Sequence, residues 1–176
     1  MHKLMDWLAV EALGVRKITG YIFLAALTWV ALFYTVQAAL VNWGFVEKSF
    51  DPDPENPFKY FNALIFLSLL VRAPLFEETI FRFVPLTITL FFTKRPSVVI
   101  TVVVLFAALF GAIHPYDTIG QIQVAIGGLV NGIVFLKCGG LQNRVIKAWL
   151  CSVATHSTVN LFLLLYDYYD YLERVL

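Results

Sequence analysis

Residues 63–92 read ALIFLSLLVRAPLFEETIFRFVPLTITLFF, an almost wholly apolar stretch that contains two adjacent glutamates, Glu77 and Glu78, and two arginines, Arg72 and Arg82. A charged side chain at the centre of a bilayer costs about 2.5–3.5 kcal/mol on insertion scales. Charges in such a segment therefore face the interior of a helix bundle, and they are candidate functional residues.

The whole chain has the composition of a membrane protein. Of its 176 residues, 60% are hydrophobic and 14% are charged, whereas soluble domains carry about 25% charged residues. A helix needs about 20 predominantly apolar residues to cross a bilayer. The sequence predicts an all-α, polytopic membrane helix bundle, with spans at 20–43, within 60–93, and at 97–114, 119–137 and 146–166.

The segment 60–93 decides whether the bundle has five or six transmembrane helices. As one helix it would be roughly 50 Å long, which is too long for a hydrocarbon core of about 30 Å. Pro74 can kink such a helix or stand in the first turn of a new one. One kinked helix gives five spans, and a hairpin of two shorter helices gives six.

The charges of the loops predict the orientation. The Lys94–Arg95 turn and the basic loop 137–147 are expected in the cytoplasm with the N-terminus, and the acidic loop 46–59 is expected outside with the C-terminus. This arrangement requires that 60–93 crosses once. The net charge is +1 and there is no long basic run, so the expected partner is the lipid bilayer and no nucleic acid is expected.

Helix geometry separates the two glutamates. Glu78 and Arg82 are four residues apart, in the order that favours an ion pair. Glu77 lies about 100° round the helix and is left free for other work. The purely structural interpretation is a buried salt bridge beside one glutamate at an interface.

Two further apolar runs carry polar side chains one helical turn apart. Phe110 precedes His114 by four residues, and His156 precedes Asn160 by four residues. A lone histidine in a membrane helix more often forms a hydrogen bond between helices than catalyses a reaction. Two histidines, an asparagine and a spare carboxylate on three different helices favour one shared site instead.

These motifs resemble those of a known family, the CAAX-protease and bacteriocin-processing enzymes, often called CPBP or Abi, which are similar to the Ras-converting CAAX endopeptidase. The resemblance covers about residues 75–160. APLFEE, before the arginine, resembles the usual lead-in of the family, whereas Phe83 stands where bacterial members often have glycine. The matching motifs, in order, are Glu77-Glu78-x-x-x-Arg82, Phe110-x-x-x-His114 and His156-x-x-x-Asn160.

The resemblance implies an intramembrane endopeptidase that needs no cofactor. Glu77 and His114 would hold and deprotonate a water molecule, and His156 and Asn160 would bind the oxyanion of the tetrahedral intermediate. The Glu78–Arg82 pair and Phe110 would support these groups. The substrate would be a membrane-anchored peptide or protein.

The implied organisation has four parts. An interfacial N-terminal segment, 1–19, is followed by the first transmembrane helix and acidic loop, 20–59, a catalytic helical bundle, 60–166, and an acidic tail, 167–176. The small size resembles bacterial members, which implies a multi-pass protein of the bacterial cytoplasmic membrane. CAAX substrates require prenylation, which bacteria generally lack, so the sequence does not name the substrate.

Three alternatives stay open. Glu77, His114 and His156 could hold a catalytic zinc, although the H-E-x-x-H motif of zinc proteases is absent. Buried carboxylates could relay protons in a transporter, although no inverted repeat is evident. The chain could also act without catalysis, as a bacteriocin immunity or scaffold protein.

The sequence also leaves undecided to which side of the membrane the active site opens. The resemblance implies an active site that opens toward the cytoplasm, whereas five spans place His114 at the outer end of its helix. A hairpin in 60–93 would remove this disagreement, but it would place Lys94 and Arg95 outside.

Overall fold

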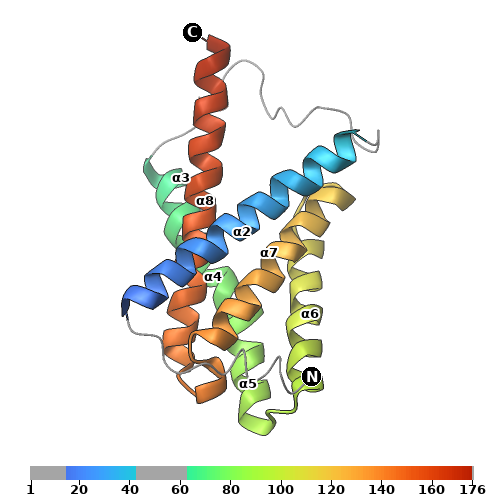
Figure 1. Ribbon diagram of the computed structural model, residues 1–176, viewed down its shortest axis with the longest axis vertical. Coiled ribbons are helices and arrows are strands. Elements are labelled where there is room, and N and C mark those ends of the chain that lie inside the picture. Colours follow the sequence, from blue (N-terminus) through green and yellow to red (C-terminus); the bar gives the residue numbers. More distant parts are fainter. Residues whose placement is uncertain (1–14, 43–62, 176) are drawn as a thin grey trace.

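The computed structural model describes residues 15–42 and 63–175, and these residues form helices and turns without a strand (Figure 1). The prediction of an all-α helix bundle is confirmed. The expected interfacial segment and the acidic loop lie mostly outside the described residues. Besides the rod described next, the helices are α2 (Val15–Asn42), α6 (Pro96–Ala112), α7 (Thr118–Lys137) and α8 (Val145–Val175).

Three helices, α2, α7 and α8, contain stretches that are long and apolar enough to cross a membrane, and α6 is a shorter apolar helix. The apolar stretch of α8 ends at Tyr166, but the helix itself continues to Val175. Most of the expected acidic tail therefore extends α8.

The segment that was expected to be either a kinked span or a hairpin is one continuous helical rod. Its backbone is helical at every residue from 63 to 92, so the hairpin is wrong. The rod runs past α8 and α6 in Figure 1. Its parts are α3 (Ala63–Leu67), the π-helical η1 (Ser68–Arg72), α4 (Ala73–Glu78), the π-helical η2 (Thr79–Phe83) and α5 (Val84–Phe92).

Each π-helical segment ends two residues before a proline. Pro74 follows η1 and Pro85 follows η2. A proline ring clashes with the carbonyl four residues back and supplies no N–H, and a π-helical turn is a common way to absorb such a disturbance within a helix. The two prolines thus widen the rod locally without breaking it.

Short turns connect the other helices. Thr93 is extended, and Pro96 stands in the first turn of α6, where a proline is tolerated. Asp117 caps α7 by accepting a hydrogen bond from the Gly120 N–H at 2.7 Å. In the turn before α8, Gly139 has a φ of +130°, a conformation that favours glycine.

Helices α6 and α7 approach closely because two glycines of α7 face α6. A Cβ atom at Gly132 would lie 2.7 Å from Val103, and one at Gly128 would lie 3.0 Å from the Cα of Ala107. Close packing through small residues is typical of membrane helices.

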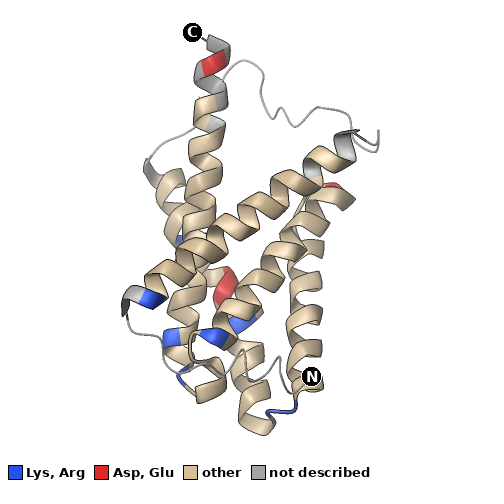
Figure 2. Cartoon of the chain, in the orientation of Figure 1, with Lys and Arg blue, Asp and Glu red and all other residues tan. Residues whose placement is uncertain are grey.

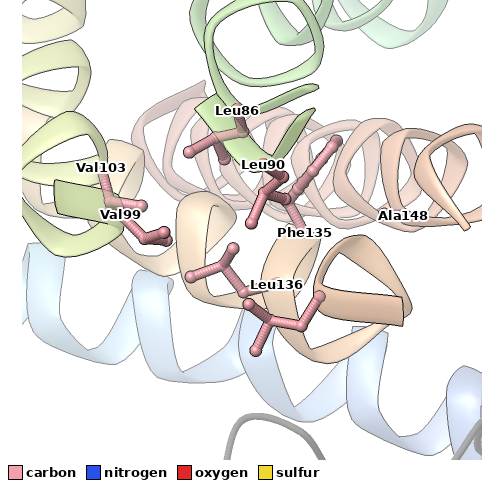
Figure 3. Close-up of a cluster of buried hydrophobic side chains, with 8 residues drawn as sticks. Leu86, Leu90, Val99, Val103, Phe135, Leu136 and Ala148 are labelled. Atoms are coloured by element: carbon pink, nitrogen blue, oxygen red, sulfur yellow. The ribbon is translucent and has the colours of Figure 1, made fainter. Parts of the chain in front are cut away.

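A cluster of buried apolar side chains joins α5, α6, α7 and α8 (Figure 3). Along the rod and on α6, α7 and α8, the cluster residues are closer to the end where α5 meets α6 than the site residues described below are. It therefore closes that end of the bundle. Its buried members are Leu86, Leu90, Val99, Val103, Phe135, Leu136, Leu141 and Ala148.

Among the described residues outside the rod, most lysines and arginines gather at this same end of the molecule, and the acidic residues lie at the other end (Figure 2). The Lys94–Arg95 turn and the α7–α8 turn come together there, because Lys94 Nζ donates a hydrogen bond to the Leu141 carbonyl at 3.1 Å. We refer to it as the basic end.

Candidate functional site

Glu78 lies at the centre of the bundle and is completely buried. Its Oε1 accepts hydrogen bonds from Asn131 Nδ2 at 2.8 Å and from His156 Nδ1 at 2.9 Å. Its Oε2 accepts a hydrogen bond from Ser152 Oγ at 2.5 Å. Residues of α4, α7 and α8 thus converge on one carboxylate, which has no exposed surface for a further ligand.

Arg82 supplies the positive charge beside Glu78. Its Nη1 lies 3.3 Å from Glu78 Oε1, so the structure forms the ion pair predicted from the spacing. The guanidinium also lies 4.2 Å from the centre of the Phe110 ring, a cation–π contact. Gly128 makes room for it, since a Cβ atom there would lie 2.8 Å from Nη2. We call Glu78, Arg82, Asn131, Ser152 and His156 the Glu78 network.

His156 stands between the two glutamates. Its Nδ1 faces Glu78, and its Nε2 lies 3.7 Å from Glu77 Oε2. An ionised carboxylate can only accept hydrogen bonds, so Nδ1 carries the hydrogen toward Glu78. That contact fixes the ring orientation and directs Nε2 toward Glu77.

Glu77 has a different environment from its neighbour. Its side chain is 24% exposed, and its Oε2 lies 3.7 Å from His156 Nε2, beyond ordinary hydrogen-bond distance. Its carboxylate oxygens therefore keep capacity to accept hydrogen bonds, as the sequence predicts for a glutamate without an arginine.

His114 and Phe110 lie at the end of α6. His114 Nδ1 is 2.6 Å from the Phe110 carbonyl; a carbonyl accepts, so Nδ1 donates and Nε2 keeps its lone pair. The Phe110 ring contacts both histidines, with centroids 4.7 Å from His114 and 5.9 Å from His156. No hydrogen bond or ion pair joins His114 to Glu77 in the described part of the chain, and Phe110 is what links it to the site.

Asn160 is held by the rod rather than by the other site residues. Its Nδ2 donates to the Leu69 carbonyl at 2.8 Å. In η1 the Ala73 N–H bonds to the Ser68 carbonyl five residues back. The next donor in this register would be residue 74, and Pro74 has no N–H. Asn160 thus replaces the missing backbone donor with one of its two amide hydrogens.

Sequence reasoning missed three residues that build the site. Asn131 and Ser152 are buried polar side chains of apolar helices. A sequence rule that treats polar residues inside apolar runs as functional candidates identifies Asn131. The third is Trp29 of α2, whose ring lies 5.5 Å from the His156 ring and fills the space left by Gly127. An apolar tryptophan in a span gives no such signal.

The described residues contain no group of three histidine, cysteine, aspartate or glutamate side chains placed to hold a metal ion. Of the alternative zinc ligands, Glu77 and His156 lie 3.7 Å apart, and no hydrogen bond or ion pair joins His114 to either of them within the described residues.

The fold and the site together define a helical membrane protein with charged and hydrogen-bonded groups at its centre. A model of the Rce1-like family, the type II CAAX prenyl endopeptidases, matches residues 59–162, and the chain belongs to this family. The resemblance drawn from the three motifs is thereby confirmed.

Family membership makes the chain a membrane-embedded protein of a protease family. No curated protein matches the chain, and no solved structure matches it either.

Proposed function

We propose that the chain is an intramembrane endopeptidase that hydrolyses a peptide bond of a membrane-anchored peptide or protein, with Glu77 as the general base. One observation carries the proposal: two adjacent glutamates flank one buried imidazole, and only one of them is saturated with partners. Glu78 has no accessible surface, whereas Glu77 is partly exposed and able to accept a hydrogen bond from water.

Charge supports a donor role for His156. When His156 is protonated, its charge and that of Arg82 balance the charges of Glu77 and Glu78, so the buried cluster is neutral. Its Nε2–H can then donate to the oxyanion that forms as water attacks the carbonyl. One such donor contributes about 2.7–4 kcal/mol to transition-state stabilisation in a well-studied hydrolase.

His114 and Asn160 complete the proposed machinery. The Nε2 lone pair of His114 can accept a hydrogen bond from the water that Glu77 deprotonates, so these two groups would act through a shared water molecule. Asn160 uses one amide hydrogen for Leu69, and its second hydrogen is available for the oxyanion. No step of this mechanism is assigned to a metal ion.

The test is hydrolysis of prenylated CAAX peptides by the full chain, purified in detergent after exhaustive chelation, with metal content measured on the same sample. We expect cleavage without bound metal, and loss of cleavage in Glu77→Gln. Activity that disappears on chelation and returns only with stoichiometric zinc would overturn the base assignment. If no such peptide is cleaved, peptidomics of membranes with wild type and Glu77→Gln identifies other substrates, and identical peptidomes would refute the proposed peptidase function.

We further propose five membrane crossings, with the basic end in the cytoplasm. The single rod across 63–92 and the charges in Figure 2 support this topology. In a chain lacking Cys138 and Cys151, an impermeant thiol reagent added outside cells should label Asp117→Cys and leave Arg95→Cys unlabelled. The reverse pattern would contradict the proposed orientation.

A further inference from the structure

The described part of the chain contains one charged residue within the rod that the site does not use. Arg72 is exposed at the end of η1, and its side chain makes no hydrogen bond or ion pair within the described residues. By contrast, Glu78 and Arg82 of the same rod neutralise each other. The Arg72 side chain can therefore bind an anionic group that lies outside the described residues.

Arg72 lines an open groove of about 560 Å³ between the rod and α8. The other lining residues carry no charge: Leu67, Val71, Leu75, Phe76, Thr79 and Trp149. The single hydroxyl, of Thr79, is occupied by the Leu75 carbonyl at 2.6 Å. The groove therefore offers one cationic group beside an apolar surface, which fits a ligand with one anionic group and a hydrocarbon body.

The position of Arg72 along the rod favours a lipid over a peptide. Arg72 precedes Phe92, the last residue of α5, by 20 residues (92 − 72), or about 30 Å of helix. This length equals the hydrocarbon thickness of a bilayer, about 30 Å. If the basic end lies at one headgroup layer, Arg72 reaches the other, and the groove from Leu75 to Trp149 extends from there toward the bilayer centre.

The groove is also separate from the catalytic side of the rod. The buried residues Pro74 and Glu78 of α4 face the bundle interior. Glu77 faces His156, whereas neither glutamate lines the groove. A peptide bound for cleavage at Glu77 is thus not expected to occupy it.

We propose that the Arg72 groove binds an anionic phospholipid, with the phosphate on the guanidinium and an acyl chain along Leu75, Phe76 and Trp149. Arginine forms charge-assisted hydrogen bonds to phosphate. The apolar wall of the groove gives the acyl chain contacts that it would otherwise make with bulk lipid. The proposal does not depend on the peptidase function, because it concerns binding alone.

The test uses the full chain in detergent and native mass spectrometry with dioleoyl phosphatidylglycerol and, as the zwitterionic match, dioleoyl phosphatidylcholine. We expect wild type to retain phosphatidylglycerol preferentially, and Arg72→Gln to bind it about tenfold or more weakly. Arg72→Lys should keep most of the preference, and Arg95→Gln, an exposed cation at the basic end, should bind like wild type.

Three outcomes would overturn the proposal. Arg72→Gln could retain the lipid like wild type, or Arg95→Gln could lose as much binding, which would indicate general attraction to basic residues. Alternatively, lipid binding could be unchanged while Arg72→Gln selectively loses affinity for a peptide with a free C-terminal carboxylate over its amide. That result would assign Arg72 to the substrate.

Discussion

Glu77 and Glu78 are neighbours in the chain, yet they belong to two different regions of the molecule. Glu78 is buried in a network of four partners from three helical elements, η2, α7 and α8. Glu77 is partly exposed, and we group it with His114 and Asn160 as the open group, because each of these side chains keeps unused hydrogen-bonding capacity. A step of one residue along the helix separates the buried carboxylate from the partly exposed one, and His156 lies between the two.

The largest expected effect is a loss of catalytic activity, and it should follow from a change at Glu77. Glu77→Gln removes the proposed base and should lower kcat/KM about 10²–10⁴-fold, the usual contribution of general-base catalysis. Its thermal unfolding in detergent should match that of wild type, because the side chain is partly exposed and makes no short hydrogen bond. An active Glu77→Gln protein would contradict the division between the two regions.

Removing the charge partner of Glu78 should have its main effect on stability. Arg82→Ala leaves a buried carboxylate without its ion pair, a change that typically costs about 3–5 kcal/mol. Denaturant unfolding in mixed micelles measures this loss, with Arg95→Ala as the control for an exposed arginine. Equal unfolding curves for Arg82→Ala and wild type would show that the ion pair is not structural.

The hydrogen bonds of the Glu78 network should contribute less individually. Ser152→Ala removes the donor to Oε2, and hydrogen bonds to charged groups are worth about 1.5–3 kcal/mol. Ser157→Ala, a half-buried serine of the same helix without a hydrogen bond to Glu78, is the matched control. If both variants lose equal stability, the bond from Ser152 has no special role.

The smallest expected effect tests the contact of Asn160, a member of the open group, with the rod. Asn160→Leu should cost about 1 kcal/mol through the Leu69 carbonyl. Pro74→Ala restores a backbone N–H that can replace the amide, so the double variant should be more stable than the sum of the single changes predicts. Strict additivity would show that Asn160 does not compensate for the proline.

The sequence predicted the fold class and the family, but it predicted few of the contacts between helices. Four-residue spacing was enough to predict the Glu78–Arg82 pair, because both residues lie on one rod. The partners on other helices, Asn131 and Ser152, depend on how α7 and α8 pack, which spacing within one helix does not encode. The length of 60–93 and the presence of Pro74 together favour a hairpin as much as a kinked span, because a proline inside a helix commonly kinks or ends it.

The π-helical segments explain why that alternative was wrong. A proline that is preceded by a widened turn stays inside a continuous helix. The equivalent placement of Pro74 and Pro85 after η1 and η2 becomes visible only once the backbone register is known. The amide of Asn160 then has a structural use that its motif alone does not reveal.

The apolar cluster at the basic end limits the routes by which water and peptide can reach the site. Hydrolysis consumes one water molecule per bond, and eight packed apolar side chains stand between the site and the basic end. In the proposed hydrolase, water and the cleaved ends therefore do not pass through this cluster, and they reach and leave Glu77 at its partly exposed surface. The cluster then acts as a dry seal at one end of the protein, and the identity of the substrate depends on what can approach Glu77 from outside that seal.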